Sequence, residues 1–258
     1  MMSARHVVVT GAASGIGAAV CESFRLDGDR VTAVDLREPR NHVGEFVQGD
    51  LADAAFAGGV VSTAWERQGP VDLVVAAAGI YPATPFVEMT AEVWDRVQAV
   101  NVRAPMLLVK ELGRLVAGAG RTACAVLISS GAANRARPGA AHYCASKAAL
   151  EMLTRAAALE LGQHGIRVNA VSPGFVDVAS QVNPVTEDYA TRVSVNPLGR
   201  RGQPADIVRA IRWLASSDAS WITGTTVRVD GGASAGNLQL PLHWADATEV
   251  QTGNEAPL

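Results

Sequence analysis

The sequence contains little lysine, tyrosine or cysteine and no long apolar run. Lysine and arginine together number 22 among 258 residues, yet only Lys110 and Lys147 are lysines. The formal net charge is -3, so there is no basic surplus to bind a phosphate backbone or an anionic membrane surface. No unbroken apolar stretch reaches the roughly 18 residues that a membrane span needs. We therefore expect neither a nucleic acid nor a membrane among the partners.

The three cysteines, Cys21, Cys124 and Cys144, form no CxxC pair and leave an odd thiol. This pattern argues against a disulfide framework and against a zinc site. The five histidines show no ligand spacing either, so we expect no metal. A reducing compartment, the cytoplasm, is the simplest location for such a chain.

Short apolar runs alternate with longer helical patterns along most of the sequence. Several runs are almost continuously apolar, as expected for strands that are covered on both faces. Because parallel neighbours need a long crossover, the alternation predicts an α/β fold, a doubly wound parallel seven-stranded sheet of Rossmann-like type in a single domain. The expected strands are His6–Thr10, Arg30–Asp35, Glu45–Gln48, Val71–Ala76, Ala123–Ser129, Ile166–Ser172 and Thr226–Val229. The expected helices lie near residues 16–27, 53–68, 91–118, 142–163 and 204–216.

Two segments fall outside this alternation. Residues 175–203 are too long for an ordinary connection, which favours a lid over a site, with a plain surface excursion as the alternative. Residues 233–258 hold three acids and no Lys or Arg. We expect a catalytic domain over residues 1–232 and an acidic C-terminal extension over residues 233–258.

A glycine-rich turn follows the first expected strand. Residues 10–17 read Thr-Gly-Ala-Ala-Ser-Gly-Ile-Gly and lead into a helix-forming stretch. Glycines permit a tight turn and a close approach to a pyrophosphate, and the helix N-terminus supplies amide donors. The motif is informative because it lies between a strand and a helix. We expect it to bind a dinucleotide through Gly11, Ser14, Gly15, Ile16 and Gly17.

Asp35 ends the second expected strand, 18 residues beyond Gly17. An acid at this place accepts hydrogen bonds from the ribose hydroxyls of NAD, and its charge repels the 2′-phosphate of NADP. Arg37 lies two residues further on and could reach such a phosphate, and Asp is also a common turn residue. We expect NAD, with NADP as the less favoured alternative.

Tyr143 and Lys147 lie four residues apart in an expected helix, and Ser130 lies at the end of an expected strand. Four residues make about one helical turn, so the phenol and the ammonium emerge on the same face. An ammonium within about 4–6 Å favours the phenolate and would make Tyr143 a usable acid or base. Ser130 belongs to the carboxyl edge, where open α/β sheets bind ligands. A Tyr/Lys pair alone is common on helix surfaces, but together with the glycine turn it indicates a catalytic site.

These motifs together resemble the short-chain dehydrogenase/reductase superfamily. The resemblance rests on the glycine turn, Asn101, Ser130, the Tyr143-x-x-x-Lys147 motif and Pro173-Gly174, in that order along the chain. It covers about residues 5–232. It implies a Rossmann-like domain, usually in a homotetramer, that moves hydride between a nicotinamide and a carbonyl or alcohol carbon.

The resemblance also implies a role for each matching residue. Tyr143 would be the acid or base, and Ser130 would hydrogen-bond the substrate oxygen. Lys147 would hold the nicotinamide ribose and lower the pKa of the tyrosine, and Asn101 would hold a water in the proton relay. The remaining implied cofactor contacts are Asp50 and Leu51 at the adenine, Ala78 and Gly79 at the adenosine ribose, and Pro173, Gly174 and Val176 at the nicotinamide.

Two places depart from the family's pattern. Ala76 and Ala77 stand where the family usually has two asparagines, which removes side-chain hydrogen bonds, and we expect a local stability cost with activity kept. Val178 stands where the family often has threonine. Because valine has no hydroxyl for the cofactor, either Ser180 or the backbone replaces that contact or the cofactor binds less tightly.

The expected substrate pocket is mostly apolar, which suits a hydrophobic secondary alcohol or ketone. Arg135 and Arg137 lie between Ser130 and Tyr143. They either grip a substrate carboxylate or, as exposed charges usually do, face solvent or a second subunit. The candidate walls are Ile80, Tyr81, Pro82, Ala132, Phe175, Val182, Val185 and Tyr189.

The sequence thus predicts an oxidoreductase that transfers hydride between NAD and a hydrophobic secondary alcohol or ketone. An NADPH-dependent carbonyl reductase is the nearest alternative. An alternative of another class is a non-catalytic dinucleotide-binding scaffold or sensor. Such a protein would be free to lose the catalytic residues, whereas Asn101, Ser130, Tyr143 and Lys147 are all present.

Overall fold

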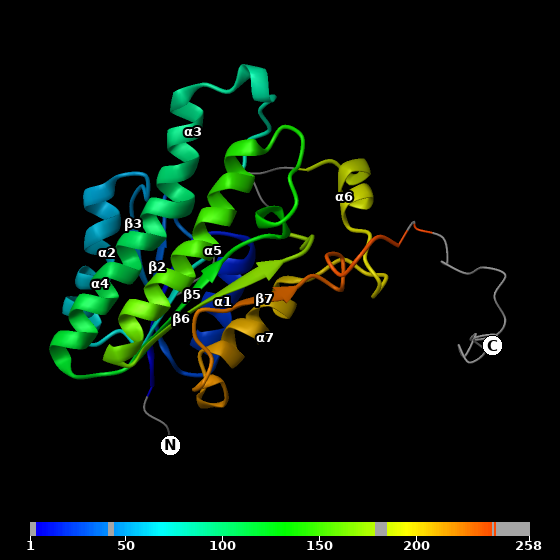
Figure 1. Cartoon of the computed structure of the whole chain (residues 1–258). Coiled ribbons are helices and arrows are strands. Elements are labelled where there is room, and N and C mark those ends of the chain that lie inside the picture. Colours follow the sequence, from blue (N-terminus) through cyan, green and yellow to red (C-terminus); the bar gives the residue numbers. More distant parts are fainter. Residues whose placement is uncertain (1–3, 41–43, 179–184, 239, 241–258) are drawn as a thin grey trace, which may run out of the picture.

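Seven strands of the chain form one parallel sheet with helices on both faces (Figure 1). The computed structural model describes residues 4–40, 44–178, 185–238 and 240. The strand order is β3-β2-β1-β4-β5-β6-β7, and every neighbouring pair is parallel. The strands are β1 His6–Thr10, β2 Arg30–Asp35, β3 Glu45–Gln48, β4 Leu73–Ala76, β5 Ala123–Ile128, β6 Ile166–Pro173 and β7 Thr226–Val229. The predicted doubly wound single domain is confirmed, with each predicted strand present and its ends within two residues.

The helices make two layers, and each layer closes its own core against one face of the sheet (Figure 1). One core holds buried side chains of α2, α4 and α5, and the other holds those of α1 and α7. Burial on both faces explains why all five residues of β1 and all six of β5 are buried. The helices are α1 Gly15–Leu26, α2 Ala54–Gln68, α3 Ala91–Gln98, α4 Ala104–Ala119, α5 Ala141–Leu161, α6 Glu187–Val193 and α7 Pro204–Leu214.

The chain leaves β1 in one direction along the sheet and returns to its other side with β4. β1 pairs with β2 through His6–Thr10 and with β4 through Val7–Thr10. The strand order therefore reverses between β1 and β4. In an open α/β sheet, such a reversal leaves a crevice outside the carboxyl ends of the strands, and ligands bind there.

Two predictions of helices need correction. The single helix expected over residues 91–118 is interrupted by a π-helical turn, Ala99–Arg103, between α3 and α4. A π turn is a single-turn insertion within a helix, and no local residue pattern distinguishes it from continued α-helix. The stretch 175–203 was predicted without regular structure, yet it holds α6, whose N-cap Thr186 accepts from the amide of Tyr189.

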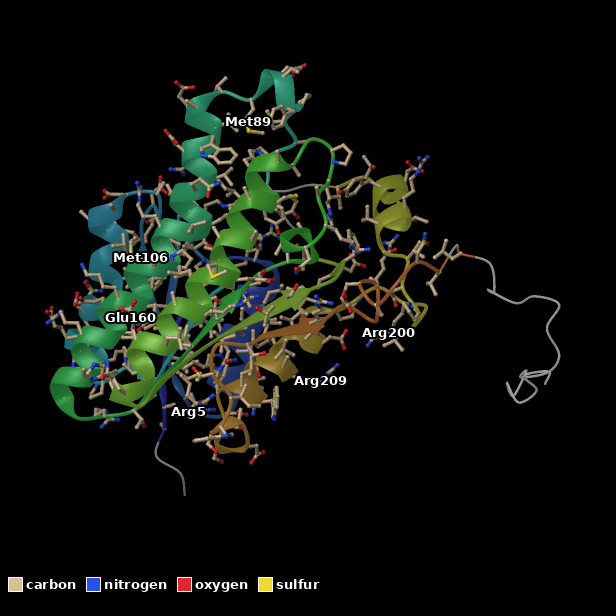
Figure 2. The ribbon with its side chains drawn as sticks, viewed as in Figure 1. Arg5, Met89, Met106, Glu160, Arg200 and Arg209 are labelled. Atoms are coloured by element: carbon tan, nitrogen blue, oxygen red, sulfur yellow. The ribbon has the colours of Figure 1, made fainter. Side chains whose placement is uncertain are left out.

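The start of α7 is held by a cluster of charges. Asp206 accepts the backbone amide of Gln203 and pairs with both Arg200 and Arg209, two side chains that flank this helix end (Figure 2). Hydrogen bonds from Arg200 hold the pKa of Asp206 far below its usual range. This carboxylate fixes the place where the stretch 175–203 joins α7.

The chain's last segment lies mostly outside the described residues. These include Asp246, Glu249 and Glu255, the acids of the predicted extension, and also Val182 and Ser180 of the stretch 175–203. Among the helices that the structure describes, none has the length and apolar character needed to cross a membrane.

Candidate active site

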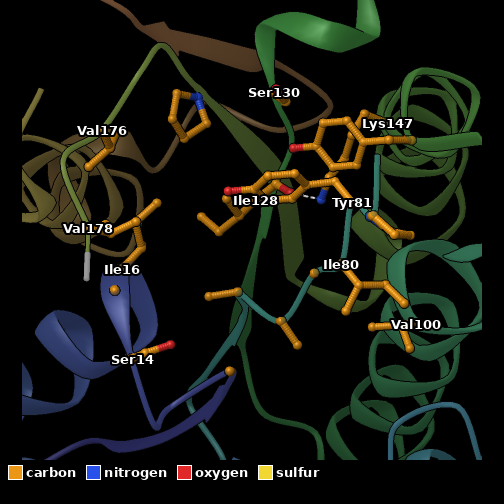
Figure 3. Close-up of a pocket in the computed structure, with 18 of the residues that line it drawn as sticks. Ser14, Ile16, Ile80, Tyr81, Val100, Ile128, Ser130, Lys147, Val176 and Val178 are labelled. Carbon is orange, nitrogen blue, oxygen red and sulfur yellow. Dashed lines mark hydrogen bonds between the residues drawn. The ribbon is translucent and has the colours of Figure 1, made fainter. Parts of the chain in front are cut away.

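A cavity of about 790 Å³ lies along the carboxyl edge of the sheet, at the strand reversal. This volume is within the usual range for small-molecule and cofactor sites. Figure 3 shows its two sides, with Ser14 and Ile16 on one and Tyr81, Ser130 and Lys147 on the other. We call the side with residues 11–17, 35–37, 49–51 and 96 the glycine-turn half, and the side with residues 80–83, 130, 137–143, 147, 175 and 185–189 the tyrosine half.

The cavity brings together every predicted site residue except one. Asn101 is fully buried and does not line it. The predicted residues that do line it are Gly11, Ser14, Gly15, Ile16, Gly17, Asp35, Asp50, Leu51, Ala78, Gly79, Ser130, Tyr143, Lys147, Pro173, Gly174 and Val176.

The glycine turn packs so closely that two of its glycines have no room for a side chain. A Cβ on Gly17 would lie 2.2 Å from the carbonyl oxygen of Gly11, and a Cβ on Gly11 would lie 2.7 Å from the amide nitrogen of Ala78. Gly11 also has a φ of 72°, which favours glycine. The turn ends at Ser14, the N-cap of α1, whose side chain makes no capping bond. The first residues of α1, Gly15, Ile16 and Gly17, line the cavity, and a helix N-terminus at such a place is suited to binding a pyrophosphate.

The carboxylate of Asp35 is held at the end of β2. It accepts the backbone amide of Ala13 at 3.0 Å and the amide of Arg37 at 3.1 Å. Each oxygen keeps a lone pair for a further donor. The side chains of Asp35 and Arg37 both line the cavity, so the acid and the base weighed from the sequence both reach the predicted ribose site.

Asp50 is engaged by a partner that the sequence did not indicate. Arg96 of α3 donates to its carboxylate at 2.7 Å, and the amide of Ala52 donates at 2.9 Å. The hydrogen bond from Arg96 lowers the pKa of Asp50. Both side chains line the cavity beside Leu51. The predicted adenine contact thus comes with a counter-ion 46 residues away in the chain.

Tyr143, Lys147 and Ser130 meet at the end of β5. The ammonium of Lys147 donates to the carbonyl oxygen of Ile128 at 2.7 Å (Figure 3) and lies 5.7 Å from the centre of the Tyr143 ring. The hydroxyl of Ser130 accepts the amide of Ala132 at 3.2 Å, which caps a short 3-10 helix. The ring of Tyr81 lies against that of Tyr143, with centroids 5.2 Å apart. The strand end therefore fixes an ammonium and a hydroxyl around one phenol.

The acidity of this cluster differs from the sequence-based prediction. Burial raises the pKa of Tyr143 to about 12, and the Ser130 hydroxyl and the Arg137 charge oppose this only in part. Burial lowers the pKa of Lys147 to about 8. We predicted that Lys147 lowers the pKa of the tyrosine, but in the protein alone desolvation outweighs the charges near the phenol. At neutral pH Tyr143 is thus a neutral proton donor.

Asn101 lies in the π turn, and its side-chain amide makes hydrogen bonds to other residues of the protein. Its side-chain oxygen accepts the amide of Ile80 at 2.9 Å, and its nitrogen donates to the Ile80 carbonyl at 2.9 Å and to Ser146 at 3.1 Å. Asn101 therefore joins the segment after β4 to α5. The water-holding role of Asn101 stays a prediction, because these side-chain contacts do not bear on it.

The two departures from the family's pattern have clear surroundings. The backbone amide of Ala78, just after Ala76 and Ala77, donates to the hydroxyl oxygen of Thr10 at 3.3 Å. This bond ties the segment to the glycine turn. Val178 lines the cavity next to Gly15, where a Cβ would meet its methyl group at 3.4 Å. The valine therefore occupies the predicted place and presents only carbon there.

Most predicted walls of the substrate pocket are where we expected them. Ala132 is wrong, because it is the buried residue of the 3-10 helix Gly131–Ala133 and does not line the cavity. Sequence reasoning missed Thr186 and Ala83, which gave no local signal. The walls found are Ile80, Tyr81, Pro82, Phe175, Val185 and Tyr189. Within the described ranges, no group of three or more His, Cys, Asp or Glu could hold a metal ion.

Comparisons with known proteins identify the family of the chain. A family model described as Enoyl-(Acyl carrier protein) reductase matches residues 11–234. The chain is 33% identical over 248 residues to a protein of Hericium erinaceus named a short-chain dehydrogenase/reductase, covering 90% of this chain and 98% of the relative. Other relatives carry the names of dehydrogenases and reductases of hydroxyl compounds.

Two solved structures share the fold and were determined with a nicotinamide dinucleotide. A 4-hydroxyisoleucine dehydrogenase complexed with NADH has a TM-score of 0.83 and 31% identity, covering 90% of this chain and 100% of the other. A blue fluorescent protein from a metagenomic library, in complex with NADPH, has a TM-score of 0.80 and 31% identity, covering 89% and 98%. The chain therefore is a nicotinamide-dinucleotide-dependent oxidoreductase that belongs to the short-chain dehydrogenase/reductase family.

Proposed function

We propose that the protein transfers hydride between NAD and a secondary alcohol or ketone with a hydrophobic body. The observation that carries this proposal is the meeting of Ser130, Tyr143 and Lys147 in the same cavity as the glycine turn. A phenol, a hydroxyl and an ammonium on one wall provide the proton transfer, and the turn on the other provides the dinucleotide site.

The chain's own residues account for binding and for the proton. Bound NAD supplies the acceptor for the two electrons and the hydrogen that leave the alcohol carbon as hydride. Tyr143 exchanges the proton of the substrate oxygen, giving it up when a ketone is reduced and taking it when an alcohol is oxidised. Ser130 orients that oxygen, and Lys147 lies where it would hold the nicotinamide ribose. Asn101 supports the wall by joining Ile80 to α5.

The preference for NAD rests on Asp35. Its carboxylate is fixed at the end of β2 and lines the cavity, so a 2′-phosphate would meet a like charge. Arg37, which also lines the cavity, is the observation that favours the NADPH-dependent alternative. Steady-state rates with NAD and NADP on the same substrate decide between them. We expect NAD to be at least tenfold better in kcat/KM, and the reverse preference would exclude this part of the proposal.

The apolar walls support a hydrophobic substrate. Phe175, Val185 and Tyr189 line the tyrosine half together with Ile80 and Pro82. The direct test is a panel of cyclic, terpenoid, steroidal and acyclic secondary alcohols with NAD, followed by absorbance of the reduced nicotinamide. We expect turnover with apolar members of the panel. Protein that binds NAD yet oxidises none of them would instead be a sensor or scaffold.

We further propose that the stretch 175–203 is a lid and that residues 233–258 form an arm outside the catalytic domain. Val185, Thr186 and Tyr189 of the stretch line the cavity, which supports the first part. Truncation after Gly232 tests the second part. Unchanged oligomer size and unchanged kinetics after truncation would refute a functional arm.

The proposal includes a homotetramer in the cytoplasm. Apolar side chains are exposed on two separate surfaces, with Met152 and Leu159 on α5 and Trp213 and Trp221 on and after α7. Trp221 is 99% exposed and Leu159 is 84% exposed. Two self-complementary faces are what a dimer of dimers needs. Light scattering tests this, with Trp221→Glu and Leu159→Glu each expected to leave a dimer. The three cysteines are free thiols, consistent with a reducing compartment.

A further inference from the structure

The charged side chains that line the cavity are divided unequally between its halves. Asp35, Arg37, Asp50 and Arg96 belong to the ends of β2 and β3 and to α3, so the glycine-turn half holds two acids and two bases. In the tyrosine half, the charged lining residues among those described are Lys147 and Arg137. No described carboxylate lines this half. Its charge is therefore positive.

Among the residues that the structure describes, Arg137 has no acidic partner. Within the described part of the chain, its guanidinium makes no ion pair and no side-chain hydrogen bond. The two acids of α6 are engaged elsewhere, because Glu187 pairs with Arg201 and Asp188 pairs with Arg192. Arg201 also lies over the ring of Phe175. The lid helix thus neutralises its own acids and leaves the charge of Arg137 uncompensated.

The backbone places Arg137 beside the reacting groups. Pro138 and Gly139 form a turn after it, and the carbonyl of Gly139 accepts the amide of Thr84 at 2.9 Å. This bond fixes the turn against the segment that carries Tyr81. The charge of Arg137 lowers the pKa of both Tyr81 and Tyr143, against the larger effect of burial. The guanidinium therefore acts on both phenols from the exposed mouth of the cavity.

Arg135 provides the contrast. It lies two residues before Arg137 on the same segment and is also exposed, but it does not line the cavity. The sequence left two interpretations open for both arginines, a carboxylate contact or a solvated charge. The structure separates them, because only Arg137 faces the apolar walls and Tyr143.

We propose that Arg137 forms an anion subsite at the mouth of the tyrosine half, and that the preferred substrates are hydroxy acids and the matching keto acids. This inference rests on the proposed function and specifies its substrate class. The apolar walls take the carbon body, Tyr143 and Ser130 take the reacting oxygen, and Arg137 takes a carboxylate. A planar guanidinium offers paired donors that match a carboxylate.

The test compares hydroxy acids with their own methyl esters, so that only the charge differs. The substrates are 2-, 3- and 4-hydroxy acids of increasing chain length, assayed with NAD on the wild type, on Arg137→Gln and on the control Arg135→Gln. A charge-assisted hydrogen bond predicts a preference of tenfold to a hundredfold for the acid over the ester. We expect Arg137→Gln to abolish that preference, mainly through a higher KM for the acid, and the readout is the ratio of kcat/KM for acid and ester, because loss of the charge near Tyr143 changes the turnover of both. Arg135→Gln should behave as the wild type.

A binding measurement tests the inference independently of turnover. Unreactive carboxylates and their amides are titrated into the complex with NADH by calorimetry, again with both variants. Binding of the carboxylate that is weaker by tenfold or more in Arg137→Gln supports the subsite, and equal binding overturns it. Esters and acids oxidised equally well, or turnover of the apolar alcohol panel with no turnover of either, would refute the subsite alone. No turnover of the panel, the acids or the esters would refute the proposed function. A change of oligomer size in Arg137→Gln would show that Arg137 is a subunit contact instead and would also overturn the subsite.

Discussion

The two halves of the cavity differ in the groups that form their walls. At the glycine turn the wall is backbone, with the start of α1 and with glycines packed against Ala78 and against each other. In the tyrosine half the wall is formed by side chains, with Tyr81 from one segment and Arg137 and Tyr143 from another far along the chain. The packed turn leaves no room for a Cβ at Gly11 or Gly17. A half made of side chains can change its specificity by substitution while the fold is kept.

The largest expected effect is a loss of turnover caused by a change in the tyrosine half alone. Tyr143→Phe removes the phenol but keeps the ring against Tyr81, so we expect turnover to fall by about 10²- to 10⁴-fold. NAD binding should stay within a few-fold, because the glycine-turn half is untouched. Stopped-flow turnover and fluorescence titration of NADH measure the two quantities. Normal turnover in this variant would remove Tyr143 from the proposed mechanism.

The next largest effect is a loss of NAD affinity caused by Gly17→Ala, a change in the glycine-turn half alone. Its Cβ would lie 2.2 Å from the Gly11 carbonyl, and overpacking of this kind costs roughly 1–3 kcal/mol. We expect NAD affinity to fall by about ten- to a hundredfold and the melting temperature to fall as well. Gly58→Ala in α2 is the matched control, because a Cβ there meets nothing within 4 Å and alanine favours the helix. Equal effects of the two substitutions would show that the turn is not tightly constrained.

Turnover, which depends on Tyr143 in the tyrosine half, should vary with pH, whereas NAD affinity, which depends on the glycine-turn half, should not. Burial raises the pKa of Tyr143 to about 12, so below that pH the phenolate that alcohol oxidation requires becomes more abundant as pH rises. We expect kcat/KM for oxidation to rise by up to tenfold per pH unit between about pH 6 and 8, and ketone reduction not to rise. Asp50 stays ionised there because Arg96 lowers its pKa, so NAD affinity should be flat. An oxidation rate independent of pH would contradict the high pKa of Tyr143.

The smallest expected effect lies where the halves join. Thr10 accepts the amide of Ala78 at 3.3 Å and is 1% exposed. Thr10→Val keeps the shape but leaves that amide unpaired, at a cost of roughly 1–2 kcal/mol. In a chain of this size we expect the melting temperature to fall by about 2–8 °C. Calorimetric melting that matches the wild type would show that the amide finds another partner.

The same contrast explains what the sequence could predict. The glycine turn, Asp35 and the Tyr143/Lys147 spacing are local patterns between recognisable strands and helices, and the structure confirms their places. The pairing of Asp50 with Arg96, and of Tyr81 with Tyr143, joins residues more than 40 positions apart. No local pattern encodes such pairs, because the path of the chain between them sets the distance.

Loops and desolvation limited the rest of the prediction. Arg135 and Arg137 are equivalent in sequence terms, and only the turn at Pro138 and Gly139 decides which of them lines the cavity. Spacing placed Lys147 beside Tyr143, but the pKa of the tyrosine depends on burial, which the sequence does not give. The seven residues of α6 are too few to show a period.

The π turn at Ala99–Arg103 has a consequence for the history of the chain. An extra residue in a helix shifts the phase of everything after it by about 100°, since an α-helix turns once per 3.6 residues. Deleting one residue there would leave a regular helix and rotate either α3 or α4 off its contacts. Asn101 would lose Ile80, and two backbone groups would lose their partner. This segment should therefore keep its length among descendants of the gene even where its side chains change.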